Sequence, residues 1–436
     1  MVNILFYNIF LRLYKAGAQL ISPWNQKARS WLSGRKNIFS RIRAEFSAAN
    51  NQVIWMHAAS LGEFEQGRPV LEKIRLLYPG SKIVISFFSP SGYEIIKNYA
   101  GADYITYLPA DSKANANRFI ALINPKLVLW IKYEYWYYYL EALKKRQIPV
   151  LLISAVFYPD YIFLKWYGNL HKKMMHNFTQ LFLQTEESKK LVAQIGITEN
   201  VTVSRDTRFD RVVEIAEKAE AFPVIEKFCG KNIPVIVAGS TWEEDEEELD
   251  HYANAHAEIK FIIAPHEINE ERLKEVESLF RRSIRYSELE KYMNDGRGPM
   301  TDFSSTNNQR SMTNVLIIDN IGMLSRLYKY ATITYVGGGF GDDGIHNVLE
   351  AAVYGKPVLY GPVIEKYVEA IELADCGGGI VVDSALEVES VFDRLLTNPE
   401  EYYHACQASK NYVYARRGAT EKIIQFIQAN RLLTTS

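Results

Sequence analysis

The sequence predicts an α/β fold built from two Rossmann-like domains, and three observations lead to this prediction. The chain has 436 residues, which is too long for one ordinary hydrophobic core. Hydrophobic residues make up 48% of it and charged residues 23%, the balance of a globular protein. Short apolar runs alternate with helical patterns, and the alternation restarts near residues 210–230. This pattern is typical of parallel sheets covered by helices.

Four apolar runs in the first half are expected to form buried parallel strands: 52–60, 82–89, 125–131 and 148–155. After the first of them, Val70, Ile74 and Leu77 recur at helical spacing, and Pro79 is expected to end that helix. The segment "WIKYEYWYYYL" follows the third strand and places Glu134 among aromatic residues. Such a cluster indicates hydrophobic core, or rings that stack on a sugar, and a carboxyl group buried there needs partners.

Five further apolar runs are expected to form the second sheet: 232–240, 259–267, 313–319, 331–339 and 355–361. The polar, turn-rich stretch 285–312 is expected to be a surface loop. We therefore predict domains at 31–215 and 216–436. Because ligands of open α/β sheets bind at the carboxyl ends of the strands, the two domains should face a central cleft.

Residues 1–30 are predicted to be a separate membrane-anchor segment. The first stretch, "MVNILFYNIFLRLYKAGAQLI", is apolar and aromatic but interrupted by Arg12 and Lys15, so it lacks the uninterrupted run of a spanning helix. Residues 1–45 hold eight Lys or Arg and one acid, Glu45. Two interpretations remain open: a core helix with a basic exposed face, or a helix lying in the interface of the cytoplasmic leaflet.

Composition excludes some classes of function. The formal net charge is −1, so no overall field selects nucleic acid. The cysteines, Cys229, Cys376 and Cys406, are far apart and lack metal-binding spacing. They are expected to be unpaired thiols in a reducing compartment.

A glycine-rich loop after the 331–339 strand is the first candidate site. "GGGFGDDGIHN" offers backbone N–H groups to an anion, with Gly338 and Gly339 in the loop, but it matches neither the dinucleotide fingerprint nor the Walker motif. Glu350 lies three residues after Asn347, which indicates either a capping box or a carboxylate for ribose hydroxyls. Asp342 and Asp343 are interpreted as turn formers and not as metal ligands.

Two further strand ends of the second domain carry polar side chains. Ser240 and Thr241 end the 232–240 run, where a ligand contact is as plausible as a capping box between Thr241 and Glu244. The acidic run that follows is expected to be structural. His266 lies just past the end of the 259–267 run.

In the first domain, "HAASLGEFEQG" joins a strand to a helix. Ser60 and Glu63 have the spacing of a capping box, and this is the structural interpretation of Glu63. The functional interpretation makes Glu63 a general base, with Gly62 permitting close approach of a substrate. His57 is the alternative base on the same segment.

Taken together and in this order, these blocks resemble the 3-deoxy-D-manno-octulosonic acid (Kdo) transferases of lipid A biosynthesis. "HAASLGE" and "GIHNVLE" match the two most specific family motifs, and "QTEES", "TRFD", "GSTW", "APHE" and "DNIGML" match further ones. The resemblance covers about residues 1–425. Departures exist: "KYEYWYY" retains only Glu134 and Trp136 of its family block, and His266 stands where many members have arginine.

The resemblance implies a GT-B glycosyltransferase fold and an inverting transfer of Kdo from CMP-Kdo to a lipid A precursor, lipid IVA, with no cofactor and no protein-held metal. It implies an enzyme of lipopolysaccharide biosynthesis at the cytoplasmic face of the inner membrane. The implied catalytic base is Glu63, and the implied acceptor-binding residues are Ser60, Gly62 and Glu134. The implied donor-binding residues are Arg208, Ser240, Thr241, His266, Gly322, Met323, Gly338, Gly339, Asn347 and Glu350.

Two alternatives remain. One is a GT-B transferase that uses another nucleotide sugar, such as a UDP-hexosamine. The other is a catalytically degenerate binding protein, against which the presence of Glu63, Asn347 and Glu350 counts.

Overall fold

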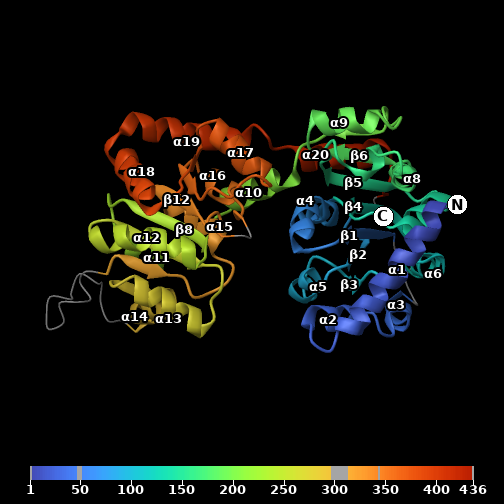
Figure 1. The fold of residues 1–436 in the computed structure, drawn as a ribbon, viewed down its shortest axis with the longest axis horizontal. Helices are drawn as coiled ribbons and strands as arrows, with labels where there is room; N and C mark the ends of the chain where they lie inside the picture. Colours follow the sequence, from blue (N-terminus) through green and yellow to red (C-terminus); the bar gives the residue numbers. More distant parts are fainter. Residues whose placement is uncertain (1, 47–51, 296–312, 342–343, 435–436) are drawn as a thin grey trace. The chain divides into compact units, whose positions relative to one another are not determined.

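The computed structural model describes residues 2–46, 52–295, 313–341 and 344–434, and it divides into two compact units (Figure 1). The first unit comprises residues 1–211 and 417–436, and the second comprises residues 212–416. The boundary lies within helix α10 (Thr207–Glu217). The predicted limits therefore need one correction: residues 417–436, which we expected in the second domain, belong to the first unit.

The first unit contains a parallel sheet of seven strands in the order β3-β2-β1-β4-β5-β6-β7. The four predicted strands are present as β1 (Val53–Ala58), β2 (Lys82–Phe87), β4 (Pro125–Ile131) and β5 (Val150–Ala155). The prediction missed β3 (Tyr104–Tyr107), β6 (Gln180–Leu183) and β7 (Val201–Val203). These strands have three or four residues, too few for a distinct apolar run.

Helices cover both faces of this sheet because successive strand residues point to opposite sides. Trp55 lies in one core with side chains of α3, α6, α7 and α8, whereas Met56 lies in a second core with α4 and α20. The helices are α1 (Val2–Ile21), α2 (Gln26–Gly34), α3 (Ile38–Phe46), α4 (Leu61–Leu77), α5 (Pro90–Ile96), α6 (Lys113–Ile123), α7 (Tyr137–Lys145), α8 (Asn169–Met175), α9 (Glu186–Ala193) and α20 (Ala419–Ala429).

The second unit repeats this plan with a parallel sheet in the order β10-β11-β9-β8-β12-β13-β14. The five predicted strands are β8 (Val235–Thr241), β9 (Lys260–Pro265), β11 (Val315–Ile317), β12 (Ile333–Val336) and β13 (Val358–Tyr360). The short edge strands β10 (Ser283–Arg285) and β14 (Gly379–Val381) were missed.

The helices of the second unit again lie on both faces of its sheet. Side chains of α12 (Glu243–Ala255), α13 (Glu270–Leu279) and α18 (Ala385–Thr397) share a core with one face. The remaining helices are α11 (Pro223–Cys229), α14 (Tyr286–Asn294), α15 (Leu324–Leu327), α16 (Leu349–Ala352), α17 (Val368–Asp375) and α19 (Pro399–Tyr414). Helix α14 corrects the loop predicted at 285–312, whose residues 296–312 lie outside the described part of the chain.

Helix α1 has two apolar faces, one packed against the core and the other exposed to solvent. Ile4 and Tyr7 pack against the core of the first unit, and the Tyr7 hydroxyl donates a 2.6 Å hydrogen bond to Asp111 Oδ2. The other face leaves large apolar side chains exposed, including Phe6 at 64% and Leu13 at 66%. No described helix, α1 included, has the length and apolar content that crossing a bilayer requires.

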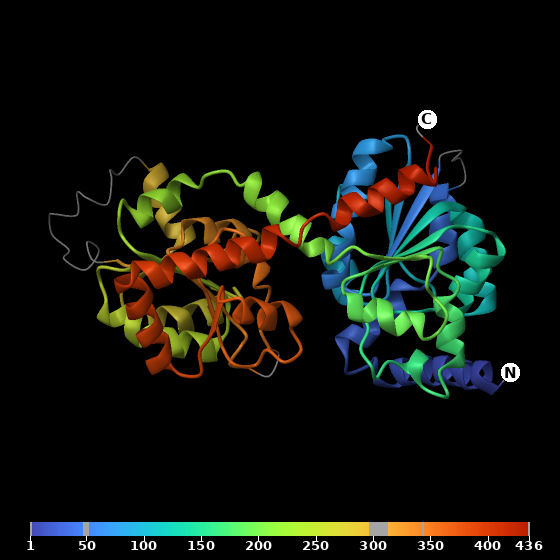
Figure 2. The same cartoon turned by 90° about the horizontal axis from the view of Figure 1, so that it is seen from above.

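The C-terminal helix α20, red in Figures 1 and 2, packs against α4 and shares one core with it. Ile423, Ile424 and Ile427 are buried in that core. The Asp210 carboxylate accepts hydrogen bonds from Gly418 N–H and Thr420 N–H at the start of the helix. The last residues of the chain therefore complete the first unit.

We predict that Ile427→Ala lowers the free energy of unfolding of the first unit by about 2–4 kcal/mol, because it opens a cavity under the sheet. Chemical denaturation followed by circular dichroism measures the change. Gln428→Ala, at an exposed position of the same helix, should leave stability within about 0.5 kcal/mol of the wild type. Equal stability of both variants would contradict the role assigned to α20.

Candidate active site

The predicted residues of the first unit gather where its strand order reverses. Strand β1 lies between β2 and β4, so the chain runs outward in opposite directions on its two sides. Glu63 follows β1, and Glu134 follows β4, at the carboxyl ends of these neighbouring strands. This switch point is where open α/β sheets bind their ligands.

Glu63 lies in the first turn of α4, and its carboxylate turns back to accept a hydrogen bond from Ala59 N–H. Burial raises the pKa of Glu63 to about 7, although the backbone N–H groups of Ala59 and Ser60 and the charge of Lys132 favour the ionised form. Part of the predicted capping pattern is therefore present. Ser60 is the N-cap residue, but its side chain makes no capping hydrogen bond.

Glu134 is the second carboxyl group of the site, and its raised pKa favours the protonated form. Burial, and next the charge of Glu63, raise the pKa of Glu134 to about 8. Its Oε2 atom is buried without a hydrogen-bond partner among the described residues. The two carboxyl groups are thus electrostatic neighbours, and at neutral pH Glu134 is mostly neutral.

His57 is unsuited to the role of base that the sequence left open. It is fully buried, and burial lowers its pKa to about 3, so the imidazole is neutral. Nδ1 lies 2.9 Å from Ser86 Oγ, and Nε2 lies 3.9 Å from Glu134 Oε2. With both groups neutral at pH 7, this last contact is not an ion pair. His57 therefore lies beside Glu134 in the interior and has no exposed surface that a substrate could contact.

Gly62 is exposed, and a methyl group added to it would meet no atom within 4 Å. The space above the first turn of α4 is consequently open. The protein's own packing does not require glycine here, in agreement with the idea that a ligand approaches at this point.

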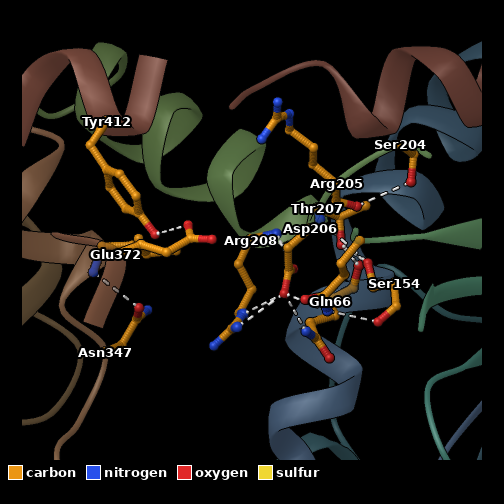
Figure 3. Close-up of polar contacts among 12 residues, drawn as sticks. Gln66, Ser154, Ser204, Arg205, Asp206, Thr207, Arg208, Asn347, Glu372 and Tyr412 are labelled. Atoms are coloured by element: carbon orange, nitrogen blue, oxygen red, sulfur yellow. Dashed lines mark hydrogen bonds and ion pairs between the residues drawn. The ribbon is translucent and has the colours of Figure 1, made fainter. Parts of the chain in front are cut away.

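A second polar cluster in the first unit surrounds the buried Asp206 (Figure 3). Its Oδ2 accepts hydrogen bonds from Gln66 Nε2 at 2.8 Å, Gln184 Nε2 at 2.9 Å and Arg208 Nε at 3.0 Å. Burial opposes ionisation, but the charges of Arg208 and Lys132 outweigh it and lower the pKa of Asp206. Arg208, an expected donor-site residue, is therefore held by this carboxylate at the start of α10.

In the second unit, the glycine loop follows β12, the neighbour of β8 at that sheet's switch point. Gly338 has φ 89°, a conformation that favours glycine. A methyl group on Gly339 would lie 2.6 Å from the Gly361 backbone nitrogen. The buried Asp245 carboxylate fixes the loop by accepting hydrogen bonds from Gly338 N–H at 2.8 Å and Trp242 N–H at 2.9 Å.

Ser240, Thr241 and His266 lie at the ends of β8 and β9. The Thr241 hydroxyl donates a 2.7 Å hydrogen bond to the buried Glu246, so the predicted Thr241–Glu244 capping box is wrong. Only one of the two bonds of a capping box is present, from Trp242 N–H to the Asp245 carboxylate, because the helix begins two residues after Thr241. The exposed His266 ring stacks on both Trp242 and His346, with its centroid 4.6 Å from each, and the Trp242 indole N–H donates to His346 Nε2 at 3.1 Å.

Asn347 and Glu350 interact with each other at the start of α16. Asn347 Nδ2 donates to Glu350 Oε1 at 3.0 Å, and Asn347 Oδ1 accepts from Leu349 N–H at 3.3 Å. Helix α16 has only four residues, so its dipole adds less to anion binding than we expected. Gly322 and the buried Met323 precede α15, beyond the end of β11.

Sequence reasoning missed several residues of these sites. Gln66 stands in a motif that we quoted and Asp206 directly precedes another, but only the fold shows that the two side chains meet. Asp245 had a local signal, since it occupies the third helical position after Trp242. Among the described residues no group of three or more His, Cys, Asp and Glu could hold a metal ion. Asp342 and Asp343 lie outside the described residues.

Comparison with known proteins supports the family resemblance. Residues 35–211 match the family model of the 3-deoxy-D-manno-octulosonic-acid transferases. The chain is 25% identical to the 3-deoxy-D-manno-octulosonic acid transferase of Haemophilus influenzae over 423 residues, which is 94% of this chain and 93% of that protein. It is also 26% identical to a bifunctional glycosyltransferase/methyltransferase of Fusobacterium nucleatum, over 91% of this chain but only 58% of that longer relative.

The fold is also found in solved structures. UDP-GlcNAc 2-epimerase from Neisseria meningitidis, in complex with UDP-GlcNAc, superposes with a TM-score of 0.60. It covers 87% of this chain and all of its own, with 19% sequence identity. At this identity the similarity concerns the fold alone. It confirms the prediction of two parallel-sheet α/β domains of the GT-B kind.

Glu63→Gln is predicted to stabilise the first unit at high pH. Because the folded-state pKa of about 7 exceeds the ordinary 4.5, the folded protein binds more protons between these values, and stability falls as the pH rises through them. Glutamine carries no charge. The variant should therefore melt roughly 2–6 °C higher at pH 8.5 and close to the wild type at pH 4.5. Differential scanning calorimetry measures both, and the exposed Glu187→Gln is the control. A pH-independent difference would contradict the raised pKa.

Proposed function

We propose that this chain, a member of the Kdo transferase family, transfers Kdo from CMP-Kdo to a lipid A precursor such as lipid IVA, with inversion at the anomeric carbon. The observation that carries the proposal is the pair of half-buried carboxyl groups, Glu63 and Glu134, at the switch point of the first sheet. Their different surroundings suit them to different tasks, and the family similarity of residues 35–211 covers both.

Glu63 acts as the general base. Its pKa of about 7 places it near the operating pH, where a base is both sufficiently ionised and sufficiently basic. A sugar hydroxyl attacks the anomeric carbon of Kdo, the bond from that carbon to the CMP phosphate oxygen breaks, and the hydroxyl proton passes to Glu63. CMP leaves with the electron pair of the broken bond, so the transfer needs no redox partner.

Glu134 acts differently because it is mostly protonated at neutral pH. A neutral carboxyl group donates a hydrogen bond and does not compete for the acceptor's proton. It therefore orients the acceptor beside Glu63. Opposite roles for two neighbouring carboxyl groups follow from environments that separate their protonation states.

The second unit holds the donor. The loop at Gly338 and Gly339 offers backbone N–H groups to the phosphate, and Glu350 accepts hydrogen bonds from the ribose hydroxyls. The exposed His266 replaces the arginine of many relatives and presents an imidazole at the nucleotide. Ser240, Thr241, Gly322, Met323 and Asn347 complete the proposed donor set. Arg208, held at the start of α10 by Asp206, is proposed to contact the nucleotide sugar as well.

Glu63→Gln should reduce turnover of CMP-Kdo about 10²- to 10⁴-fold, while CMP affinity stays within about twofold. Radiolabelled transfer to lipid IVA and calorimetric titration with CMP measure the two quantities. His57→Gln should act mainly through stability, since the ring is buried. Near-normal transfer by Glu63→Gln, with transfer abolished in a folded His57→Gln variant, would assign the base to His57.

We also propose that α1 binds the cytoplasmic leaflet of the inner membrane as a peripheral helix. Its exposed face presents Leu5, Phe6, Ile9, Phe10 and Leu13, which would otherwise remain in water. The charge of residues 1–45, eight Lys or Arg against one acid, attracts anionic headgroups.

Phe6→Ser and Leu13→Ser should each weaken binding to vesicles that contain anionic phospholipid by about tenfold, because each removes a large apolar side chain from the interface. Both side chains are more than half exposed, so the melting temperatures of the variants should equal that of the wild type. Leu386→Ser, at an exposed position of α18, is the matched control and should leave vesicle binding unchanged. Unchanged co-sedimentation of the α1 variants would refute the interfacial role.

A further inference from the structure

The buried carboxylate of Asp206 accepts hydrogen bonds from three segments of the first unit (Figure 3). Gln66 belongs to α4, Gln184 directly follows β6, and Arg208 lies in the first turn of α10. Oδ2 accepts from all three side chains, and Oδ1 accepts from Arg208 N–H at 2.8 Å. A carboxylate has about four lone-pair sites, so these donors use its acceptor capacity.

The guanidinium of Arg208 is held side-on by this carboxylate. Its Nε and Nη2 atoms each lie 3.0 Å from Asp206 Oδ2. The Arg208 side chain is 24% exposed, whereas the Asp206 side chain is 4% exposed. A flexible arginine side chain loses rotamer entropy when it binds an anion, and holding it beforehand reduces that loss. Asp206 therefore presents a partly accessible cation in a fixed orientation.

The start of α10 is attached to the first unit by other hydrogen bonds. The buried Thr207 hydroxyl donates to the backbone oxygen of Gln66, and its Oγ1 lies 3.0 Å from Ser154 Oγ in β5. Asp210, one turn of the helix further on, accepts from two backbone N–H groups at the start of α20. Because these contacts already fix the helix, its attachment does not require the bond between Asp206 and the guanidinium.

The ion pair of Asp206 and Arg208 is also a weak source of stability. The loss of hydration that burial causes largely offsets the attraction between two such charges. Burial opposes ionisation of Asp206, and the charges of Arg208 and Lys132 lower its pKa in spite of this. A pair that adds little to stability can still fix the orientation of an arginine.

The pair lies near the proposed base. Gln66 follows Glu63 by three residues in α4, so the two side chains lie on adjacent turns of one helix face. The charge of Lys132 lowers the pKa of both Glu63 and Asp206, so Lys132 lies within electrostatic reach of both carboxyl groups. Asp206 itself follows β7, at the carboxyl edge of the sheet, where open α/β folds bind their ligands.

We propose that Asp206 is a positioning residue, which holds the Arg208 guanidinium so that it binds an anionic group of the sugar nucleotide, and that Gln66 ties this pair to the helix of Glu63. The inference rests on the proposed function. CMP-Kdo carries two anionic groups, the phosphate of CMP and the carboxylate of Kdo, and a planar guanidinium matches either. Asp206 acts through Arg208, because its own side chain is buried.

The affinity for CMP-Kdo, measured by calorimetric titration of the full chain without acceptor, tests this role independently of transfer. Asp206→Asn keeps the size of the side chain and removes its charge, so Kd should rise about 5- to 20-fold. Arg208→Ala removes the cation itself and should raise Kd about 10- to 50-fold. The double variant should bind as Arg208→Ala does, since a missing guanidinium cannot be positioned.

Asp210→Asn is the matched control in the same helix. It weakens the contact with α20, so it should lower the melting temperature while Kd for CMP-Kdo stays within about twofold of the wild type. In transfer assays, Asp206→Asn should raise KM for CMP-Kdo and change kcat less than about threefold, as expected for lost binding. Gln184→Met removes one donor to Asp206 without changing a charge, and it provides a second test if Asp206→Asn does not fold. Its Kd should rise about 2- to 5-fold.

Titration with CMP separates the two anionic groups, because CMP carries the phosphate but not the Kdo carboxylate. If Arg208 binds the phosphate, Asp206→Asn weakens the binding of CMP and of CMP-Kdo alike. If Arg208 binds the carboxylate, only the affinity for CMP-Kdo falls. Either result supports the positioning role and identifies the group that Arg208 contacts.

Other results would overturn the proposal. Unchanged CMP-Kdo affinity in a folded Asp206→Asn or Gln184→Met variant, with normal transfer by the wild type, refutes the positioning role and leaves the proposed function standing. A double variant in which the two losses multiply also refutes it, since independent losses mean that Asp206 does not act through Arg208. Asp206-dependent binding of CMP-Kdo by a wild type that transfers no Kdo would support the positioning role and refute the proposed function. A wild type that does not bind CMP-Kdo would refute both.

Discussion

Burial of two carboxyl groups at the switch point of the first sheet is the constraint on which the chemistry of the first unit depends. Glu63 and Glu134 follow neighbouring parallel strands, so the sheet brings them together although 70 residues separate them in the chain. Burial favours the neutral form of each, and the charge of one raises the pKa of the other. The positive charge of Lys132 lowers the pKa of Glu63 and is not among the causes that shift the pKa of Glu134. Glu63 therefore titrates near pH 7, and Glu134 retains its proton to a higher pH.

The second unit is built on close backbone packing. Its glycine loop passes so near Gly361 that a side chain at Gly339 would collide with the backbone, and Asp245 ties the loop to the start of α12. The acidic run in the first turn of α12 therefore contributes to the structure, as expected, and its buried member Asp245 also shapes the proposed donor site.

Helix α1 connects the proposed membrane contact with the first unit. One face is held by Tyr7 and Asp111, and another leaves aromatic and aliphatic side chains in water. A helix that moved independently of the first unit could anchor the protein, but it could not line a cavity of that unit. Its attachment to the first unit lets Phe10 and Tyr14 line a cavity of that unit beside the face that we propose enters the lipid interface.

The sequence by itself determined the two sheets, nine of their strands and the order of the functional motifs, because side-chain periodicity and motif spacing are local properties. Only the tertiary structure decided that α20 completes the first unit, because α20 packs against α4, which lies more than 300 residues earlier in the chain. It also decided that His57 is buried and neutral while Glu63 titrates near pH 7. Protonation depends on burial and on charges contributed by distant segments, and no local pattern records either.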